Sequence, residues 1–240
     1  NALVQVGEGA LSTPNLRATQ VELYEGLIAR TVNGWPSLAF DVGAINNRLS
    51  RLLPAGFYYK SFLVSTTMWH RLIEPVIRRA AGLGVTDDVA DVSRYDSHYQ
   101  HADIVVVGAG PTGLQAARVA AKSGARVMLV EQDTECGGSL LRDPVEIDGM
   151  DADLWVATVE AELAAAPNVR VLTRTTLSGV FDHNMLTALE RVTDHFDVPE
   201  ADGDYRPRMR WHRIRAKQVV LATGAFERPL VFRNNDLPGI

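Results

Sequence analysis

The sequence contains a single cysteine, Cys136, among 240 residues. A disulfide within the chain is therefore impossible, and disulfide-reductase chemistry, which needs a pair of thiols, is excluded. A chain without disulfides fits a reducing compartment, so we expect a cytoplasmic protein. The simplest role for the lone thiol is inert packing.

An excess of positive charge and a long hydrophobic run are also missing. The chain has 24 basic and 29 acidic residues, which gives a formal net charge of −5. This balance argues against general attraction to nucleic acid or to an anionic membrane face. No apolar run approaches the about 20 residues that cross a bilayer, so we expect neither partner. The start, NALVQVGEGA, has no initiator Met and no signal-peptide pattern, so we treat the chain as a possible fragment.

Metal-ligand pairs and catalytic constellations are not evident either. None of the six histidines forms an H-x-x-x-H pair, and no C-x-x-C pair exists, so we expect no metal site. His98 and His101 belong to a polar stretch that is expected to face solvent. His183 fits a turn better than a subunit contact. Asp182 and Asp194 are expected at surfaces or turns rather than as an acid–base pair, so we predict no catalytic residue.

Residues 1–101 lack a clear domain pattern, and we expect an N-terminal arm with short helices that contacts other subunits. Residues 18–24 alternate like a short strand, and residues 42–53 have helical spacing. An amphipathic helix is predicted over 66–84. The polar stretch 86–101 indicates a linker or surface arm.

Two features of this arm carry finer expectations. Pro75 lies inside the predicted helix and should kink it, and Gly82 and Gly84 should end it. An aromatic cluster favours a subunit contact over local core, because aromatic side chains anchor interfaces. The cluster comprises Trp35, Phe57, Tyr58 and Tyr59.

From residue 102 the pattern becomes that of an α/β domain. Residues 102–108 (ADIVVVG) form a continuous β-branched run, which is typical of a fully buried strand. A helix follows over 111–124, opened by a proline and closed by a glycine. A second buried strand spans 125–132, so the three elements make a βαβ unit.

The remaining elements extend this unit. An amphipathic helix is predicted over 151–168, a strand over 169–174 and a buried strand over 218–224. Residues 177–195 and 205–218 read as antiparallel strands of a meander, although residues 186–195 fit a helix equally well. We therefore predict a Rossmann-type three-layer FAD/NAD(P)-binding domain over 102–240, with a parallel sheet and an antiparallel meander.

The stretch IVVVGAGPTGLQAA explains why glycines follow a buried strand. Gly108, Gly110 and Gly113 spell G-x-G-x-x-G between that strand and the next helix. The first glycine permits the tight turn, the second lets a pyrophosphate approach the backbone, and the third lets the helix pack closely on the sheet. The intervening Ala109, Pro111 and Thr112 complete the loop. The loop has no lysine, so it is not a Walker phosphate loop.

Further residues strengthen the nucleotide-binding reading. Glu131 ends the second strand, where an acid can accept hydrogen bonds from the adenosine ribose and would repel a 2′-phosphate. Gln132 follows it, and Gly137, Gly138 and Ser139 form a small-residue loop that can pass close to a dinucleotide. Thr223 and Gly224 close the last buried strand at the carboxyl edge of the sheet, where ligands of open α/β folds bind.

These motifs resemble the two-dinucleotide-binding-domain flavoprotein superfamily. The stretches at 33–62 and 181–195, together with ATGAFERPLVFRNNDLPG, are similar to the amino-terminal half of the alpha subunits of heterotetrameric sarcosine oxidases. The resemblance covers nearly all of residues 1–240, whereas the glycine motifs alone would not separate this family from opine oxidoreductases.

The resemblance implies a division of labour. It implies NAD in the G-x-G-x-x-G domain, bound by Gly108, Gly110, Gly113 and Glu131 with Thr223 and Gly224 nearby. It also implies beta, gamma and delta partner subunits, with FAD, FMN and zinc in the complete complex. Sarcosine would be demethylated oxidatively to glycine, with folate as one-carbon acceptor and oxygen as electron acceptor, and the amine would be oxidised on another subunit.

Two alternatives remain open from the residues. The site can hold FAD and serve an amine or opine dehydrogenase directly, because FAD and NAD share the ADP half that the fingerprint reads. The chain can also be a scaffold that binds no nucleotide, which the intact glycines and Glu131 make the weaker reading.

Overall fold

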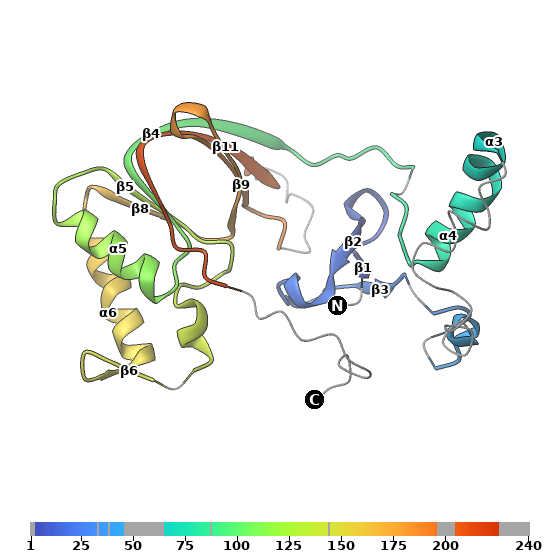
Figure 1. Cartoon of the computed structure of the whole chain (residues 1–240), viewed down its shortest axis with the longest axis horizontal. Helices are drawn as coiled ribbons and strands as arrows, with labels where there is room; N and C mark the ends of the chain where they lie inside the picture. The colour runs from blue at the N-terminus through green and yellow to red at the C-terminus, as the bar shows by residue number, and fades with distance from the viewer. Residues whose placement is uncertain are drawn as a thin grey trace. The chain divides into compact units, whose positions relative to one another are not determined.

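The structure is a computed structural model that describes residues 3–32, 34–37, 39–45, 65–86, 88–143, 145–195 and 205–225. The chain divides into two compact units, residues 1–93 with 195–205 and residues 94–194 with 206–240. Figure 1 shows the elements of both units. Among the described residues, no helix combines the length and the hydropathy that crossing a bilayer requires.

The first unit contains a three-stranded antiparallel sheet that the sequence did not predict. Its order is β2-β1-β3, formed by Thr13–Arg17, Leu3–Val6 and Ala29–Thr31. The strand predicted over 18–24 is wrong, because this stretch begins with the 3-10 helix η2 (Ala18–Gln20) and then has no strand. Among the described residues of this unit, the other short 3-10 helices are η1 (Gly9–Leu11) and η3 (Val42–Ala44).

The helix predicted over 66–84 is present as three consecutive segments. They are α3 (Thr66–Met68), the π-helical η5 (Trp69–Ile73) and α4 (Glu74–Ala80). Pro75 lies in the first turn of α4, directly after the π-helical segment, so the helix changes its winding where the proline removes a donor.

The end of α4 is a Schellman motif. Gly82 has a φ of 72°, and its N–H donates to the carbonyl of Arg79, while the N–H of Leu83 donates to Arg78. Gly82 therefore ends the helix as predicted. Gly84 instead pairs with the side chain of Asn15, accepting and donating one hydrogen bond. Most of the predicted helix 42–53, and Phe57, Tyr58 and Tyr59, lie outside the described residues.

The second unit is built on a six-stranded sheet of order β8-β5-β4-β11-β10-β9. Its four parallel strands are β8 (Val169–Leu172), β5 (Val127–Val130), β4 (Tyr95–Val107) and β11 (Met209–Leu221). The antiparallel meander adds β10 (Met185–Arg191) and β9 (Thr175–Phe181). The parallel sheet and the meander are confirmed, and the strand reading of residues 186–191 replaces the helical one.

Strand β4 corrects the reading of residues 86–101. It begins at Tyr95 and pairs with β11 from Met209 onward, so residues 95–101 are strand rather than linker. This stretch looks polar because exposed and partly buried residues alternate along the strand. Every second residue from Tyr95 to His101 is exposed. Likewise, the two strands predicted over 205–218 and 218–224 are parts of one continuous strand, β11.

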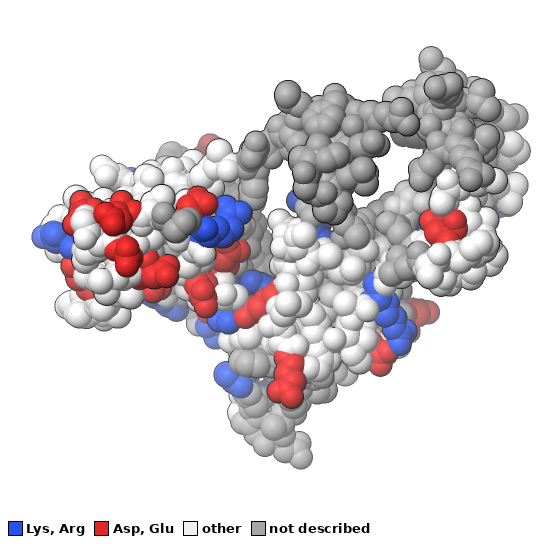
Figure 2. Space-filling view, turned by 90° about the horizontal axis from the view of Figure 1, so that it is seen from below, with Lys and Arg blue, Asp and Glu red and all other residues white. Residues whose placement is uncertain are grey.

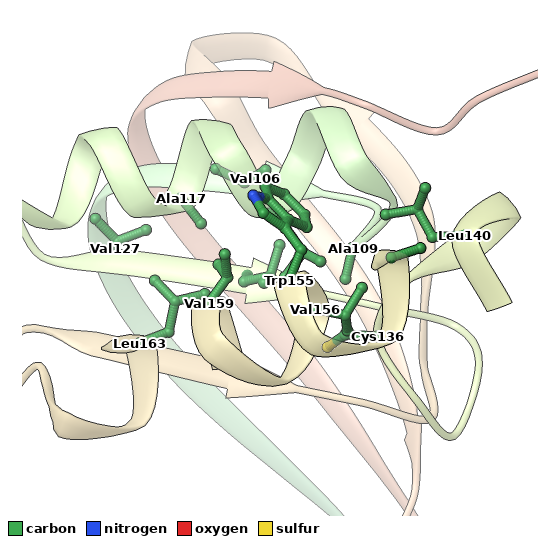
Figure 3. Close-up of a cluster of buried hydrophobic side chains, with 13 residues drawn as sticks. Val106, Ala109, Ala117, Val127, Cys136, Leu140, Trp155, Val156, Val159 and Leu163 are labelled. Carbon is green, nitrogen blue, oxygen red and sulfur yellow. The ribbon is translucent and has the colours of Figure 1, made fainter. Parts of the chain in front are cut away.

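Helices α5 (Pro111–Ala121) and α6 (Ala152–Ala165) cover one face of the parallel strands. Figure 3 shows the buried cluster between them and the sheet, with the Trp155 ring near its centre. Between α5 and α6 the chain forms the 3-10 helix η6 (Gly138–Leu141) and the small hairpin β6–β7 (Glu146–Ile147 and Met150–Asp151). The 3-10 turn η7 (Asp182–Asn184) joins β9 to β10, so His183 lies in a turn as predicted.

The sheet is strongly curled. Strands β8 and β9 form its opposite edges, yet only residues 173 and 174 separate them in the chain. Such a link spans about 10 Å at most, whereas six strands side by side in a flat sheet would span about 24 Å. A second core lies inside the curl, because Met128 of β5 and Ala188 of β10 belong to one buried cluster. Helices, parallel strands and meander make the three predicted layers.

Asp103 ties β4 to the residue that precedes β5. The N–H groups of Asp103 and Ile104 both donate to the carbonyl of Arg126. The Asp103 carboxylate accepts from the backbone and the guanidinium of Arg126 and lies 2.9 Å from the ammonium of Lys217. These donors hold the pKa of Asp103 far below its usual range, with the Arg126 side chain as the largest cause.

We expect Asp103→Asn to reduce how steeply the free energy of unfolding falls at acid pH. Because the folded pKa of Asp103 is depressed, its contribution is complete above an unfolded pKa of about 3.9 and is lost as the pH falls below that value. Urea unfolding at pH values from about 6 to 2 should show a shallower acid-induced loss in the variant. Equal slopes in variant and wild type would contradict this role.

Trp155 offers a second test of the core. Its side chain is 2% exposed, and its buried Nε1 finds no hydrogen-bond partner among the described residues. Trp155→Ala should lower the free energy of unfolding by about 3–5 kcal/mol through the cavity that it leaves. Trp155→Phe should cost less than half of that, because it also removes an unpaired buried donor. Denaturant titration of both variants tests the difference, and similar losses would refute the account.

Candidate functional site

The glycine loop joins the end of β4 to α5 and lies between two neighbouring strand ends. The N–H of Gly108 donates to Val130 at the end of β5, and the N–H of Ala222 donates to Val107. Gly108 has a φ of 95°, and a Cβ there would lie 2.4 Å from the carbonyl oxygen of Ala222. The tight turn that the sequence predicted at this residue therefore exists and excludes any side chain.

The other two glycines of the loop differ in what surrounds them. A Cβ on Gly113 would lie 1.8 Å from the carbonyl oxygen of Gly108, so the helix packs directly on the turn. A Cβ on Gly110 would meet no atom within 4 Å, and Gly110 has an ordinary φ of −70°. Gly110 therefore borders an open space at the N-terminus of α5. A side chain at position 110 would enter this space and obstruct a phosphate there.

The first turn of α5 supplies donors to this space. Pro111 occupies its first position and has no N–H, while Thr112 is exposed and Gly113 follows it. The first N–H groups of a helix have no acceptor within the helix, and the helix dipole adds about half a positive charge there. An 11-residue helix such as α5 thus offers backbone donors to an anion without any lysine.

Glu131 lies against the same loop. It follows β5 directly, its side chain is buried, and its Oε2 accepts the N–H of Ala109 at 2.5 Å. Its Oε1 accepts the N–H of Asp133 at 3.0 Å. Each carboxylate oxygen can accept two hydrogen bonds, so both oxygens keep one acceptor position for ribose hydroxyls. The carboxylate thus faces the glycine loop, as an adenosine-binding acid requires.

The loop after Glu131 closes over the glycines. The N–H of Gly137 donates to the carbonyl of Ala109 at 2.8 Å, and a Cβ on Gly138 would lie 2.9 Å from the Cα of Gly110. Ser139 is exposed in η6, immediately after this contact. The two glycines predicted to pass close to a dinucleotide therefore pack on the backbone of the glycine loop.

Thr223 and Gly224 follow the end of β11 at the same edge. A Cβ on Gly108 would lie 3.3 Å from the Cα of Thr223, so Thr223 borders the first glycine, and Gly224 is exposed beside it. All thirteen predicted site residues thus lie at the carboxyl ends of β4, β5 and β11, or in the loops and first helical turns that follow these strands. That they bind a nucleotide stays a prediction.

Sequence reasoning missed three residues that form or contact the turn after Glu131. The carbonyl of Asp133 accepts the N–H of Arg174, the carbonyl of Arg174 accepts the N–H of Arg191, and the guanidinium of Arg191 donates to the carbonyl of Gln132 at 3.3 Å. Arg174 and Arg191 are more than forty positions away from Glu131 in the chain, so no local motif signals them. Arg174 follows β8, the neighbour of β5, and the pairing of β10 with β9 places Arg191 beside it.

The remaining candidates from the sequence have structural surroundings. Cys136 is buried, and desolvation, helped by Glu160, raises the pKa of its thiol to about 12, so it is no nucleophile at neutral pH. His212 is fully buried and bonds Glu190 Oε2 at 2.7 Å and the side chain of Gln100. This partner holds the pKa of Glu190 below its usual range. Among the described residues, no cluster of potential ligands is arranged to hold a metal ion.

The surface charge is mixed. On the face drawn in Figure 2, acidic and basic side chains are interspersed among the described residues, and basic residues form no continuous patch there. The formal net charge of −5 agrees with this distribution.

Comparison with known proteins places the chain among relatives. Sarcosine oxidase subunit alpha of Rhizobium meliloti (strain 1021) is 52% identical over 240 residues, which are 100% of this chain and 24% of that protein. Sarcosine oxidase subunit alpha of Corynebacterium sp. (strain P-1) is 54% identical over 161 residues, 66% of this chain and 16% of its own length. The chain thus spans a quarter or less of these relatives. The resemblance to sarcosine oxidase alpha subunits is confirmed.

The chain also matches a solved structure and a family model. L-proline dehydrogenase from P. horikoshii matches with 25% identity and a TM-score of 0.46, over 63% of this chain and 28% of that chain. The sequence model of the pyridine nucleotide-disulphide oxidoreductases matches residues 102–240. The chain therefore belongs to the pyridine nucleotide-disulphide oxidoreductase family, with sarcosine oxidase alpha subunits among its relatives.

Proposed function

We propose that this chain binds NAD at the glycine loop. One observation carries the proposal: the Glu131 carboxylate is bonded to the Ala109 amide, beside the open space at Gly110. This arrangement joins an acceptor for ribose hydroxyls to a backbone anion site, and an ADP moiety needs both. The bound group would supply hydride chemistry through its nicotinamide.

Each part of the site has a separate task in this proposal. The N–H groups of the first turn of α5 hold the pyrophosphate, and Gly110 leaves room for it. Glu131 orients the ribose. The loop at Gly137 and Gly138 packs on the backbone of the glycine loop and holds it in place. These groups are backbone amides and a carboxylate that already accepts two amides, so they bind and orient a nucleotide and transfer no proton.

We further propose that the chain acts within a multi-subunit sarcosine oxidase of the cytoplasm. Its relatives are named as subunits, which supports the presence of partner subunits. By the family resemblance these would be beta, gamma and delta subunits, and the complete complex would also hold FAD, FMN and zinc. The complex would demethylate sarcosine to glycine with folate and oxygen as acceptors. The amine would be oxidised on another subunit, as the family resemblance implies.

A pair of alanine substitutions separates folding from binding. Gly110→Ala should leave the thermal midpoint unchanged, because its Cβ enters open space at an unstrained φ. It should nevertheless weaken NAD binding at least about tenfold, because the methyl group occupies the phosphate position. Gly113→Ala should destabilise the fold, because its Cβ would lie 1.8 Å from the Gly108 oxygen. Calorimetric binding and thermal melts of the complete protein test both.

The nucleotide that Gly110→Ala loses identifies the ligand. Non-covalent nucleotides are released by denaturing the complete wild-type and variant proteins and are identified by mass and absorbance. Loss of NAD supports the proposal, loss of FAD supports the alternative of a flavin site, and an unchanged nucleotide content supports a scaffold without a nucleotide.

Sarcosine turnover tests the proposal at the level of the complex. The complete protein with its partner subunits should consume oxygen and form glycine from sarcosine, whereas this chain alone should not, because the amine site is assigned to another subunit. An opine serves as the control substrate. Oxidation of the opine in place of sarcosine, or turnover of sarcosine by this chain alone, would contradict the assignment.

A further inference from the structure

Strand β4 continues past the helices that cover its carboxyl end. Near that end, Ile104 and Val106 belong to the cluster beneath α5 and α6, whereas Ala102 belongs to the second core. From Tyr95 to His101 the strand pairs with β11, while its pairing with β5 begins only at Ile104. Figure 1 shows this first part of β4 running on beyond α5 and α6. The sheet therefore has an extension that the two helices leave uncovered.

The two faces of this extension carry different side chains. Even-numbered residues of this part of β4 point with Ala102 into the curl, and there Asp96 bonds Arg210 at 2.9 Å. The residues between them point outward. On this outer face the guanidinium of Arg213 lies over the ring of Tyr99, 5.1 Å from its centroid. The outer face is thus the continuation of the face that α5 and α6 cover.

Aromatic side chains occupy the outer face of the extension. Tyr95 is 55% exposed and Tyr99 is 74% exposed. Trp211 of β11 lies opposite Ser97, which stands between the two tyrosines in β4, and its side chain is half-buried. Three aromatic residues therefore lie next to one another on two neighbouring strands, and two of them are turned to solvent.

Cations accompany these rings without acidic partners. The printed geometry pairs Arg213 with the Tyr99 ring and Arg215, which is exposed, with the carbonyl of His183. Among the described residues, neither guanidinium forms an ion pair with a carboxylate. The face therefore keeps an uncompensated positive charge in a chain whose formal net charge is −5.

This composition fits a contact between subunits better than a contact within one chain. The covered part of the same face presents Val106, Val127 and Leu129 to the helices, as a permanently buried surface does. Tyrosine, tryptophan and arginine are instead the residues enriched where two proteins meet. Relatives of this chain are named as subunits, so such a partner has a place in the complete protein.

We propose that the outer face of β4 and β11 docks an acidic surface of a partner subunit. The face comprises Tyr95, Tyr99, Trp211, Arg213 and Arg215. The rings supply the apolar contact area, and the two guanidiniums select a surface of opposite charge. This inference rests on the proposed function, because that function supplies the partner subunits.

Charge reversal tests the electrostatic part of the inference. Arg213→Glu and Arg215→Glu are made in the complete chain and assembled with its partner subunits. Lys122→Glu is the matched control, because it reverses one exposed cation at the end of α5, away from the extension. Thermal midpoints of the unassembled variants verify that each is folded, and native mass spectrometry gives the assembled fraction over a dilution series.

We expect each arginine variant to weaken assembly at least about tenfold at about 50 mM salt, with a smaller difference at about 500 mM, because salt screens the charges. The Lys122→Glu complex should assemble within about twofold of wild type, as expected for a charge outside the interface. If folded Arg213→Glu and Arg215→Glu chains assemble as well as the control, the inference is overturned.

Hydroxyl-radical footprinting of Tyr95 and Tyr99 locates the contact independently of any substitution. Protection that appears only when the partner subunits are added supports the inference. Protection already present in the complete chain alone assigns the face to another part of that chain, and protection by a single-stranded oligonucleotide assigns it to nucleic acid. Either result overturns the inference, as does unchanged exposure in the assembled complex. A wild-type chain that forms no complex overturns the proposed partner subunits and this inference together, while NAD binding stands.

Discussion

The close approach of α5 to the end of β4 is the contact on which the site depends. Gly113 faces the carbonyl oxygen of Gly108 at a distance that no side chain tolerates, and this lets the helix begin directly at the sheet edge. The first N–H groups of α5 therefore open at the carboxyl ends of β5 and β11. Glu131 and Thr223 reach the loop for the same reason, because they end the two strands that flank β4.

The curl of the sheet is the second constraint. The two-residue link after β8 brings the far edge of the sheet back to the parallel strands. This closure creates the second core. It also places Arg191, at the end of β10, against the turn after Glu131, so the meander borders the candidate site.

Local patterns predicted most of the α/β unit because its elements are long and strongly patterned. The buried strands, α5, α6 and the meander are where the sequence indicated them. The errors are in segments whose partners are remote. Residues 95–101 look polar, and they form a strand only because β11 pairs with them, while residues 186–191 fit helix and strand alike until β9 and β11 decide.

The sequence by itself determined the glycine loop, the acid that ends the second strand and the family resemblance, because each depends on residue types at fixed local spacing. Only the tertiary structure decided that the Glu131 carboxylate turns toward Ala109 and that Arg174 and Arg191 contact the turn after Glu131. The physical reason is that hydrogen bonds between strand ends form across a curled sheet. Residues far apart in the chain meet there, and no local pattern records which of them will be neighbours.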